Sequence, residues 1–144
     1  MLTATAEHAL RAMLELGRLE PKDSILGRDL AERAGVPPNY LSKILVALNR
    51  AGFVAAVRGS GGGYQLTRPA NQIRLVDVVA VFDPNSAHPR CLLDVNSECS
   101  DATACSAHDR WKSVRSAYVL FLQETTLADV AEASRPSAKS ASSQ

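Results

Sequence analysis

The sequence contains few aromatic residues and no long uninterrupted apolar stretch. Aromatic residues make up 5% of the 144 residues, so leucine, valine and alanine must fill the core that a 46% apolar content supports. Charged residues interrupt every apolar stretch before it reaches the roughly 20 residues of a membrane span. The N-terminal stretch carries Glu7, Arg11 and Glu15 at helical spacing, so an amphipathic helix is expected there rather than a signal peptide. One cytoplasmic domain, with or without an appended element, is predicted.

Cysteine is scarce, and all of it lies in one short segment. Cys91, Cys99 and Cys105 fall within fifteen residues, and His108 follows three positions after the last thiol. An odd number of thiols argues against a framework of disulfides within the chain, and a reducing compartment keeps thiols free. Three thiols and an imidazole on a polar, loop-like segment can bind a metal ion or an iron–sulfur cluster.

Acidic residues are absent from a central tract of the chain, from Arg33 to Val76, although the net charge of the whole chain is only +1. All six charged residues of this tract are basic: Arg33, Lys43, Arg50, Arg58, Arg68 and Arg74. Such an asymmetry predicts a surface for a polyanion. A solvated basic face without a partner is the alternative that charge alone leaves open.

Apolar periodicity predicts three helices in the first third of the chain, over residues 2–19, 28–34 and 40–50. Gly35 is expected to cap the second helix and Asn39 to cap the third, with the turn at residues 36–38 between them. Two helices joined by a tight turn, with polar residues at the start of the second, form the helix-turn-helix pattern. The same arrangement is also common in helical proteins of other functions.

A glycine-rich hairpin is predicted directly after these helices. Residues 53–57 and 64–67 are strand candidates, and four glycines in five residues (RGSGGGYQL) make a flexible tip between them. A hairpin at this place is the wing of a winged helix, and Arg58 is expected at its base, where a guanidinium could enter a narrow minor groove. A plain hairpin turn is the alternative. A Walker-type phosphate loop is excluded because no Gly-Lys-Ser/Thr follows.

The second half of the chain is predicted to contain a short helix, a loop and a long helix. Residues 73–82 favour a helix, although their β-branched side chains also suit a strand, and the cysteine loop follows over residues 85–107. The long helix, over residues 107–124, has an aromatic and aliphatic face. That face predicts a partner helix across a homodimer, with packing against the first helix as the alternative. It comprises Trp111, Val114, Tyr118, Phe121 and Leu122.

The predicted fold is therefore mainly α with a small β-wing: a winged helix-turn-helix followed by a long C-terminal dimerisation helix. We expect a DNA-binding domain over residues 1–84, a cluster-binding loop over 85–107 and a dimerisation helix with a short terminal helix over 108–132. The remaining residues, 133–144, have the composition of a disordered tail.

Five stretches together resemble one known family. These are HALRAMLEL, NYLSKILVALNRAGFV, VRGSGGGYQLTRP, the three-cysteine loop and TTLADV. They are similar to the IscR/NsrR/RirA family of bacterial winged-helix transcription regulators, over roughly residues 2 to 131. The wing and the cysteine loop carry most of the specificity, because a helix-turn-helix alone is widespread.

The resemblance implies a homodimer that places its third helix in the major groove of DNA and its wing in the minor groove. It also implies an iron–sulfur cluster held by Cys91, Cys99 and Cys105. Ser42 stands where IscR-type members carry an acidic base-reading residue, so the DNA sequence that they recognise does not carry over. The residues expected at DNA are Asn39, Tyr40, Ser42, Lys43, Arg50, Arg58, Gly59 and Arg68.

The fourth cluster ligand differs within this family. IscR-type members use a histidine three residues after the last cysteine, which His108 matches, and this ligand set implies a 2Fe–2S cluster. NsrR-type members use an acidic side chain near the N-terminus of the other subunit. Glu7 falls at that position, with His8 beside it, and this set implies a 4Fe–4S cluster. We favour His108, and with it 2Fe–2S, because its proximity in sequence requires no geometry between subunits.

The expected function is sequence-specific regulation of transcription, without enzymatic activity, through binding to double-stranded operator DNA. The cluster would control that binding in response to cluster supply, iron, nitric oxide or redox state. A structural Cys3His zinc site uses the same four ligands and is the alternative. A thiol enzyme using Cys105 and His108 is a third hypothesis, against which stand the lack of an oxyanion-hole motif and the presence of three thiols.

Overall fold

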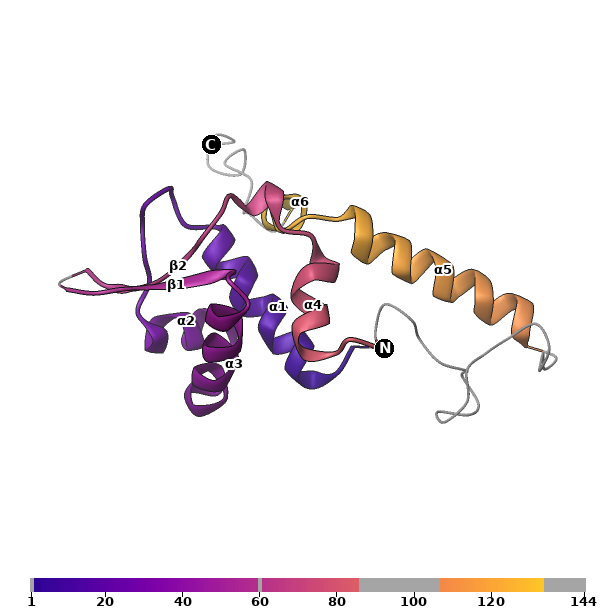
Figure 1. The fold of residues 1–144 in the computed structure, drawn as a ribbon, viewed down its shortest axis with the longest axis horizontal. Coiled ribbons are helices and arrows are strands. Elements are labelled where there is room, and N and C mark those ends of the chain that lie inside the picture. The colour runs from indigo at the N-terminus through magenta and orange to yellow at the C-terminus, as the bar shows by residue number, and fades with distance from the viewer. Residues whose placement is uncertain (1, 60, 86–106, 134–144) are drawn as a thin grey trace, which may run out of the picture.

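The computed structural model describes residues 2–59, 61–85 and 107–133. Helices dominate these parts of the chain, and a single two-stranded antiparallel sheet projects from them (Figure 1). The predicted class, mainly α with a small β-wing, is confirmed. The elements are α1 (Ala4–Gly17), α2 (Gly27–Ala34), α3 (Pro38–Arg50), β1 (Val54–Val57), β2 (Gly63–Leu66), the 3₁₀ turn η1 (Ala70–Gln72), α4 (Leu75–Phe82), α5 (His108–Glu124) and α6 (Leu127–Ala133).

Helix α1 lies at the centre of the core and contacts α2, α3, α4 and α6. It begins after Thr3, whose hydroxyl accepts a hydrogen bond of 3.2 Å from the backbone N–H of Ala6. The apolar stripe that the sequence predicts for α1 faces the core: Ala6, Met13 and Leu16 are buried, and Leu10 and Leu14 are partly buried against it. Ala9 and Ala12 are buried in addition, since small residues let several helices approach α1 closely.

The turn between α2 and α3 is a tight one. Gly35 ends α2 in the left-handed conformation (φ 66°), as expected. The predicted cap at Asn39 is wrong, because α3 begins earlier, at Pro38, and Pro37 precedes it without any side-chain cap. Proline suits the first position of a helix because its φ is already helical and its missing N–H is not needed there.

The residues that follow the wing close the core. Residues 73–82 contain the predicted helix, α4, and the Asp77 carboxylate accepts a hydrogen bond of 3.3 Å from the Arg74 backbone N–H at its start. At α6, the Asp129 carboxylate accepts one of 2.9 Å from the Thr126 N–H, which confirms the short helix after Thr126. Because α6 packs against α1, the terminal helix shares one core with the helix-turn-helix.

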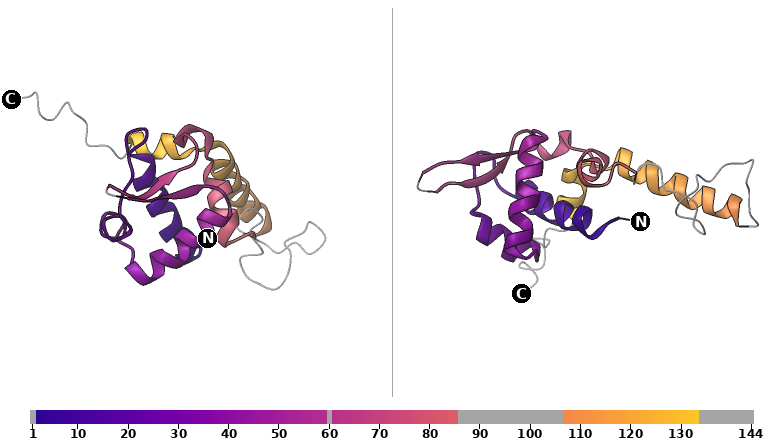
Figure 2. Two further views of the ribbon diagram at one scale, coloured as in Figure 1. Left: turned by 60° about the vertical axis from the view of Figure 1, so that its left-hand side comes forward. Right: turned by 60° about the horizontal axis from the view of Figure 1, so that its bottom comes forward.

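Helix α5 extends away from this core as an arm (Figures 1 and 2). Its contact with the rest of the described chain is mainly with α4, where Leu122 is buried. Burial, and secondarily the Asp83 carboxylate, raise the pKa of Tyr118 above its ordinary value, so its hydroxyl stays protonated at neutral pH. No helix in the described residues is both long and apolar enough to span a membrane.

Candidate nucleic-acid interface

The outward face of α3 is polar and basic, as expected for a helix that binds DNA. Its inward face is apolar and buried through Leu41, Ile44, Leu45 and Leu48. The eight exposed residues of α3 include every α3 residue predicted to contact DNA, and also three that the sequence did not single out, Pro38, Val46 and Asn49. They are Pro38, Asn39, Tyr40, Ser42, Lys43, Val46, Asn49 and Arg50.

Tyr40 links the start of α3 to α1. Its hydroxyl lies 2.6 Å from the Thr5 hydroxyl, and its ring meets the His8 ring edge-to-face with centroids 5.3 Å apart. Both partners flank Glu7, which is exposed in the first turn of α1. The orientation of α3 is thus tied to the N-terminal turn of α1.

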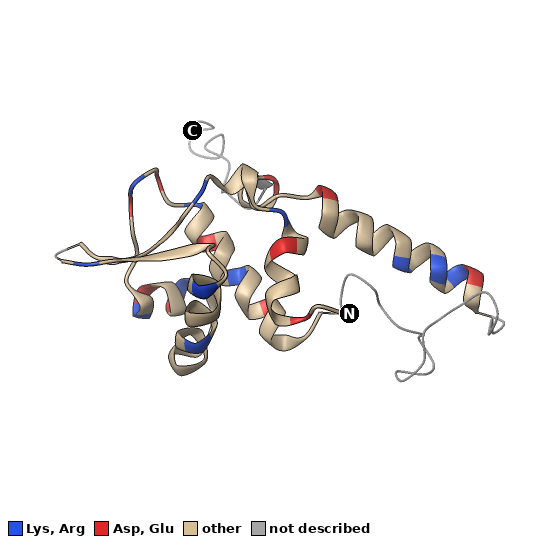
Figure 3. Ribbon diagram, viewed as in Figure 1, with Lys and Arg blue, Asp and Glu red and all other residues tan. Residues whose placement is uncertain are grey.

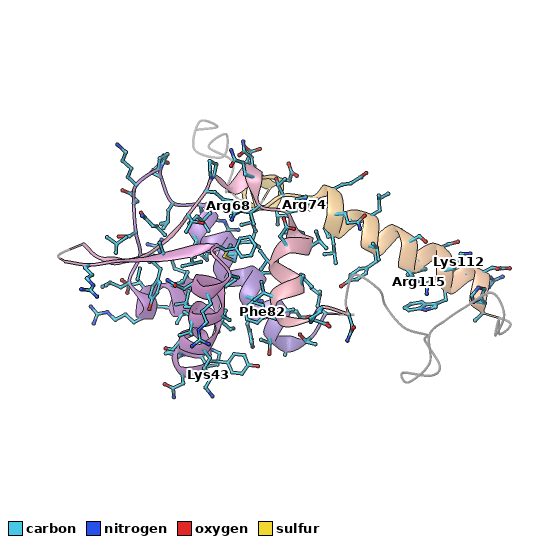
Figure 4. The ribbon with its side chains drawn as sticks, in the orientation of Figure 1. Lys43, Arg68, Arg74, Phe82, Lys112 and Arg115 are labelled. Atoms are coloured by element: carbon cyan, nitrogen blue, oxygen red, sulfur yellow. The ribbon has the colours of Figure 1, made fainter. Side chains whose placement is uncertain are left out.

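Ser42 and Lys43 occupy the middle of the exposed face. The Ser42 hydroxyl donates a hydrogen bond of 3.0 Å to the Pro38 carbonyl one turn earlier, which leaves its oxygen lone pairs to accept from a donor outside. Lys43 lies at the lower end of the molecule in Figure 4 and is exposed. A hydroxyl and an ammonium next to each other can contact a base edge and a phosphate, respectively.

Arg58 lies at a different position in the wing from the one that the sequence predicts. In the hairpin, Val54 pairs with Leu66 at the base and Val57 pairs with Gly63 at the far end. Arg58 follows Val57 and therefore lies in the tip turn, so its predicted place at the base is wrong. The glycine run did not reveal where pairing stops, since pairing depends on the register of both strands. Both Arg58 and Gly59 are exposed in the turn, which extends the reach of the guanidinium.

The wing is fastened to the chain that precedes α2, a feature that sequence reasoning missed. Ile25 and Tyr64 exchange two backbone hydrogen bonds of 3.0 and 2.8 Å and so form an isolated antiparallel bridge at the edge of β2. The Ser24 hydroxyl also donates to the Gly61 carbonyl at 2.6 Å. These contacts hold the wing at a defined angle to α2 and α3.

Gly63→Ala is expected to detach the wing from this attachment. A Cβ atom at Gly63 would lie 2.1 Å from the Ile25 carbonyl oxygen, and the φ of 141° disfavours any other residue. We expect a loss of stability of about 2 kcal/mol or more in urea unfolding. Gly61→Ala is the control, because its φ is also positive (77°) but no atom lies within 4 Å of the added Cβ. Equal losses in the two variants would mean that the close approach does not matter.

Arg68 lies on a different part of the surface from Lys43. Its guanidinium stacks over the Phe53 ring at 5.1 Å from the centroid, beyond the base of the hairpin. In Figure 4 Arg68 lies near the top of the core and Lys43 near the bottom. The two cations therefore do not form one patch.

The charged residues of α3 and the hairpin have one sign, whereas those of α2 have both (Figure 3). The exposed acids of α2, Asp29 and Glu32, precede the acid-free tract, whereas α3 and the hairpin carry only Lys and Arg among their charged residues. The favourable potential for a polyanion is thus concentrated on the helix and hairpin that a winged helix uses for DNA.

The cysteine segment joins α4 to α5. Cys91, Cys99 and Cys105 lie outside the described residues. His108 is the first residue of α5 and is buried, with 4% of its surface exposed. The first turns of α1 and α5 lie well apart in Figure 1, so Glu7 and His108 are separate positions within one chain. Within the described ranges no three Cys, His, Asp or Glu side chains gather as a metal site.

Comparisons with known proteins agree with this architecture. The model of the Rrf2 family, described as iron-dependent transcriptional regulators, matches residues 2–133. The HTH-type transcriptional regulator IscR of Vibrio atlanticus (strain LGP32) is 33% identical over 129 residues, which cover 90% of this chain and 73% of that protein.

Two solved structures share the fold. That of CymR, the global cysteine regulator of B. subtilis, has a TM-score of 0.78 at 22% identity and covers 94% of this chain and 98% of its own. That of T. potens IscR has a TM-score of 0.70 at 23% identity, with coverages of 98% and 96%. The matching family model and the similarity to IscR place this chain in the Rrf2 family of winged-helix transcriptional regulators.

Proposed function

We propose that this Rrf2-family regulator is a homodimer whose binding to operator DNA is controlled by an iron–sulfur cluster on Cys91, Cys99, Cys105 and His108. The observation that carries the proposal is the order of three parts in one chain. A basic recognition helix and wing come first, the only three thiols follow, and an arm helix begins at a buried histidine directly after them.

The DNA-binding part of the proposal rests on the geometry of α3 and the wing. Helix α3 enters the major groove with its exposed face, where Asn39 and Ser42 contact base edges and Lys43 and Arg50 contact phosphates. The wing follows the backbone to the minor groove, into which Arg58 inserts from the tip turn.

The homodimer is supported by the exposed apolar face of α5. Val114, Leu120 and Phe121 are each about half exposed, at 51, 51 and 53% of their surface, although α5 has few contacts with its own core. Val114 and Phe121 lie two turns apart on the same side of the helix. A second copy of α5 would bury this face and hold two recognition helices at the spacing of successive major grooves.

The donor set fits an iron–sulfur cluster. Three thiolates and one neutral imidazole are ligands that iron–sulfur clusters accept, and a cluster bound here supplies iron that changes its oxidation state or is lost on reaction. His108 favours the 2Fe–2S form, whereas Glu7 from the other subunit would favour 4Fe–4S. CymR, the global cysteine regulator of B. subtilis, has the same fold, so the fold alone does not indicate which signal this protein would sense. The proposal of an iron–sulfur signal rests on the donor set.

The position of the segment suggests how ligation would reach the DNA-binding surface. The segment connects α4, which packs against α1, to α5, which carries the proposed dimer interface. Cluster ligation within this connection would alter the angle between the winged helix and the arm, and therefore the distance between the two recognition helices. Because Tyr40 of α3 contacts Thr5 of α1, a movement of α1 would also move α3.

A structural zinc site is the second candidate, because Cys3His is also a zinc ligand set. The absorption spectrum of anaerobically purified protein separates the two, since zinc is colourless. A colourless protein loaded with zinc would overturn the iron–sulfur proposal and leave DNA binding untouched.

Arg58→Ala is expected to raise the dissociation constant for the operator about tenfold. The dissociation constant for a random duplex should rise less. The reason is that a guanidinium in a narrow minor groove senses DNA shape, whereas a phosphate contact is the same for every sequence. Lys22→Ala is the matched control: it removes one exposed cation outside the acid-free tract. Fluorescence anisotropy with both duplexes gives the comparison. Equal losses on both would reduce Arg58 to a phosphate contact.

A further inference from the structure

The outward face of α3 contains an exposed aliphatic side chain, which cannot form hydrogen bonds to DNA. Val46 has 50% of its surface exposed. The residues three and four positions away on either side share its face, and all four are polar or basic. They are Ser42, Lys43, Asn49 and Arg50. Val46 therefore lies at the centre of the face that the proposed function directs at DNA.

Tyr40 is the other large hydrophobic side chain exposed on α3, and it differs from Val46 in its surroundings. The Tyr40 ring packs against His8, and its hydroxyl contacts Thr5. Val46 lies two helical turns beyond Asn39, about 10 Å along the helix axis. It would therefore meet a base pair different from the one that the first turn contacts.

The chemistry of the major groove provides one apolar partner for such a side chain. Every base edge there presents hydrogen-bond donors or acceptors, and only thymine adds a C5-methyl group. A valine in a helix has one strongly preferred χ1 rotamer, so it presents its methyl groups at a fixed place and loses little entropy on contact. The hydroxyl, ammonium, amide and guanidinium around it can bond to the neighbouring polar groups.

We propose that Val46 determines specificity by packing against the C5-methyl group of a thymine in each half-site. This inference rests on the proposed function, since it requires α3 to lie in the major groove. It adds an apolar contact to the polar ones of Asn39 and Ser42, and it assigns an A·T pair to a defined place in the operator half-site.

The test uses a duplex that the wild-type protein selects from a random-sequence library. Each thymine is replaced in turn by deoxyuridine, which removes only the methyl group. We expect one thymine per half-site at which this replacement weakens wild-type binding about fourfold, the factor for one buried methyl group. Val46→Ala should bind the thymine duplex as weakly as the wild type binds the deoxyuridine duplex, and should not respond to the replacement.

A further variant controls this experiment. Val46→Ile keeps the branched side chain and should keep the full response to the methyl group. Truncation at an exposed helical position favours folding, because alanine has the higher helix propensity.

The outcomes separate this inference from the function on which it rests. A Val46→Ala protein that still responds to the loss of the methyl group overturns the role of Val46. So does a wild-type protein that binds its selected duplex with no methyl-sensitive thymine, although DNA binding itself then stands. If the wild-type protein selects no duplex, DNA recognition and the role of Val46 fail together.

Discussion

Phe121→Asp is expected to turn the dimer into a monomer and to lower operator affinity by roughly a hundredfold or more, because each monomer then contacts one half-site. Phe121 has 53% of its surface exposed and lies on the same side of α5 as Val114. In the proposed dimer both side chains are buried against the partner helix. A carboxylate placed there without a cation would be desolvated, which costs several kcal/mol for each copy. Sedimentation velocity at micromolar concentration measures the dissociation directly.

Ser116→Asp is the matched control for this variant. Ser116 is exposed on the same helix but five residues from Phe121, so it lies on a different side. It should leave the dimer and the operator affinity unchanged. If Phe121→Asp remains dimeric, the interface lies elsewhere on the protein, and the exposed face of α5 needs another explanation.

Replacing any one of the three cysteines by alanine is expected to abolish the iron–sulfur chromophore and leave a folded dimer. Each of Cys91, Cys99 and Cys105 would supply one ligand, and a cluster with two thiolates left is not retained. The dimer should persist, because the proposed interface is the exposed apolar face of α5, whose sequence contains no cysteine. Absorption spectra and sedimentation of anaerobically purified variants test both parts. Full colour in one variant would remove that residue from the ligand set.

The fourth ligand can be tested in the same series. His108→Gln should lose or destabilise the chromophore, and Glu7→Gln should keep it. Mössbauer spectroscopy should then show a 2Fe–2S cluster in the wild-type protein with one iron that has a non-cysteine ligand. The opposite pattern, with Glu7→Gln colourless and a 4Fe–4S cluster in the wild type, would assign the ligand to the partner subunit's α1.

Local patterns in the sequence were sufficient for most of the fold. Gly35 could be assigned to a helix end because a left-handed residue there is usually glycine, and the apolar spacing of α3 marks its buried face. The Asn39 cap failed because Pro38 competes for the same helix start. Ala9 and Ala12 of α1 were not predicted as core residues, because their burial depends on how closely other helices approach, which periodicity does not reveal.

The candidate site was predicted less completely, since it depends on contacts between distant residues. The attachment of Ile25 to Tyr64 and the place of Arg58 in the tip turn follow from strand register, which no short motif encodes. Val46 and Asn49 were missed because the search was for cations and polar groups near the start of α3. The three cysteines and His108 were proposed as ligands from composition and spacing alone, and that ligand set remains a prediction.

The central claim is that an iron–sulfur cluster controls DNA binding, and one paired measurement tests it most directly. Anaerobically purified protein is divided, the cluster is removed from one half with ferricyanide and a chelator, and both halves are titrated by anisotropy against the selected duplex. We predict that the two operator affinities differ at least about tenfold, which corresponds to a coupling of about 1.4 kcal/mol. Equal affinities, or a purified protein that holds zinc and no iron, would contradict the account.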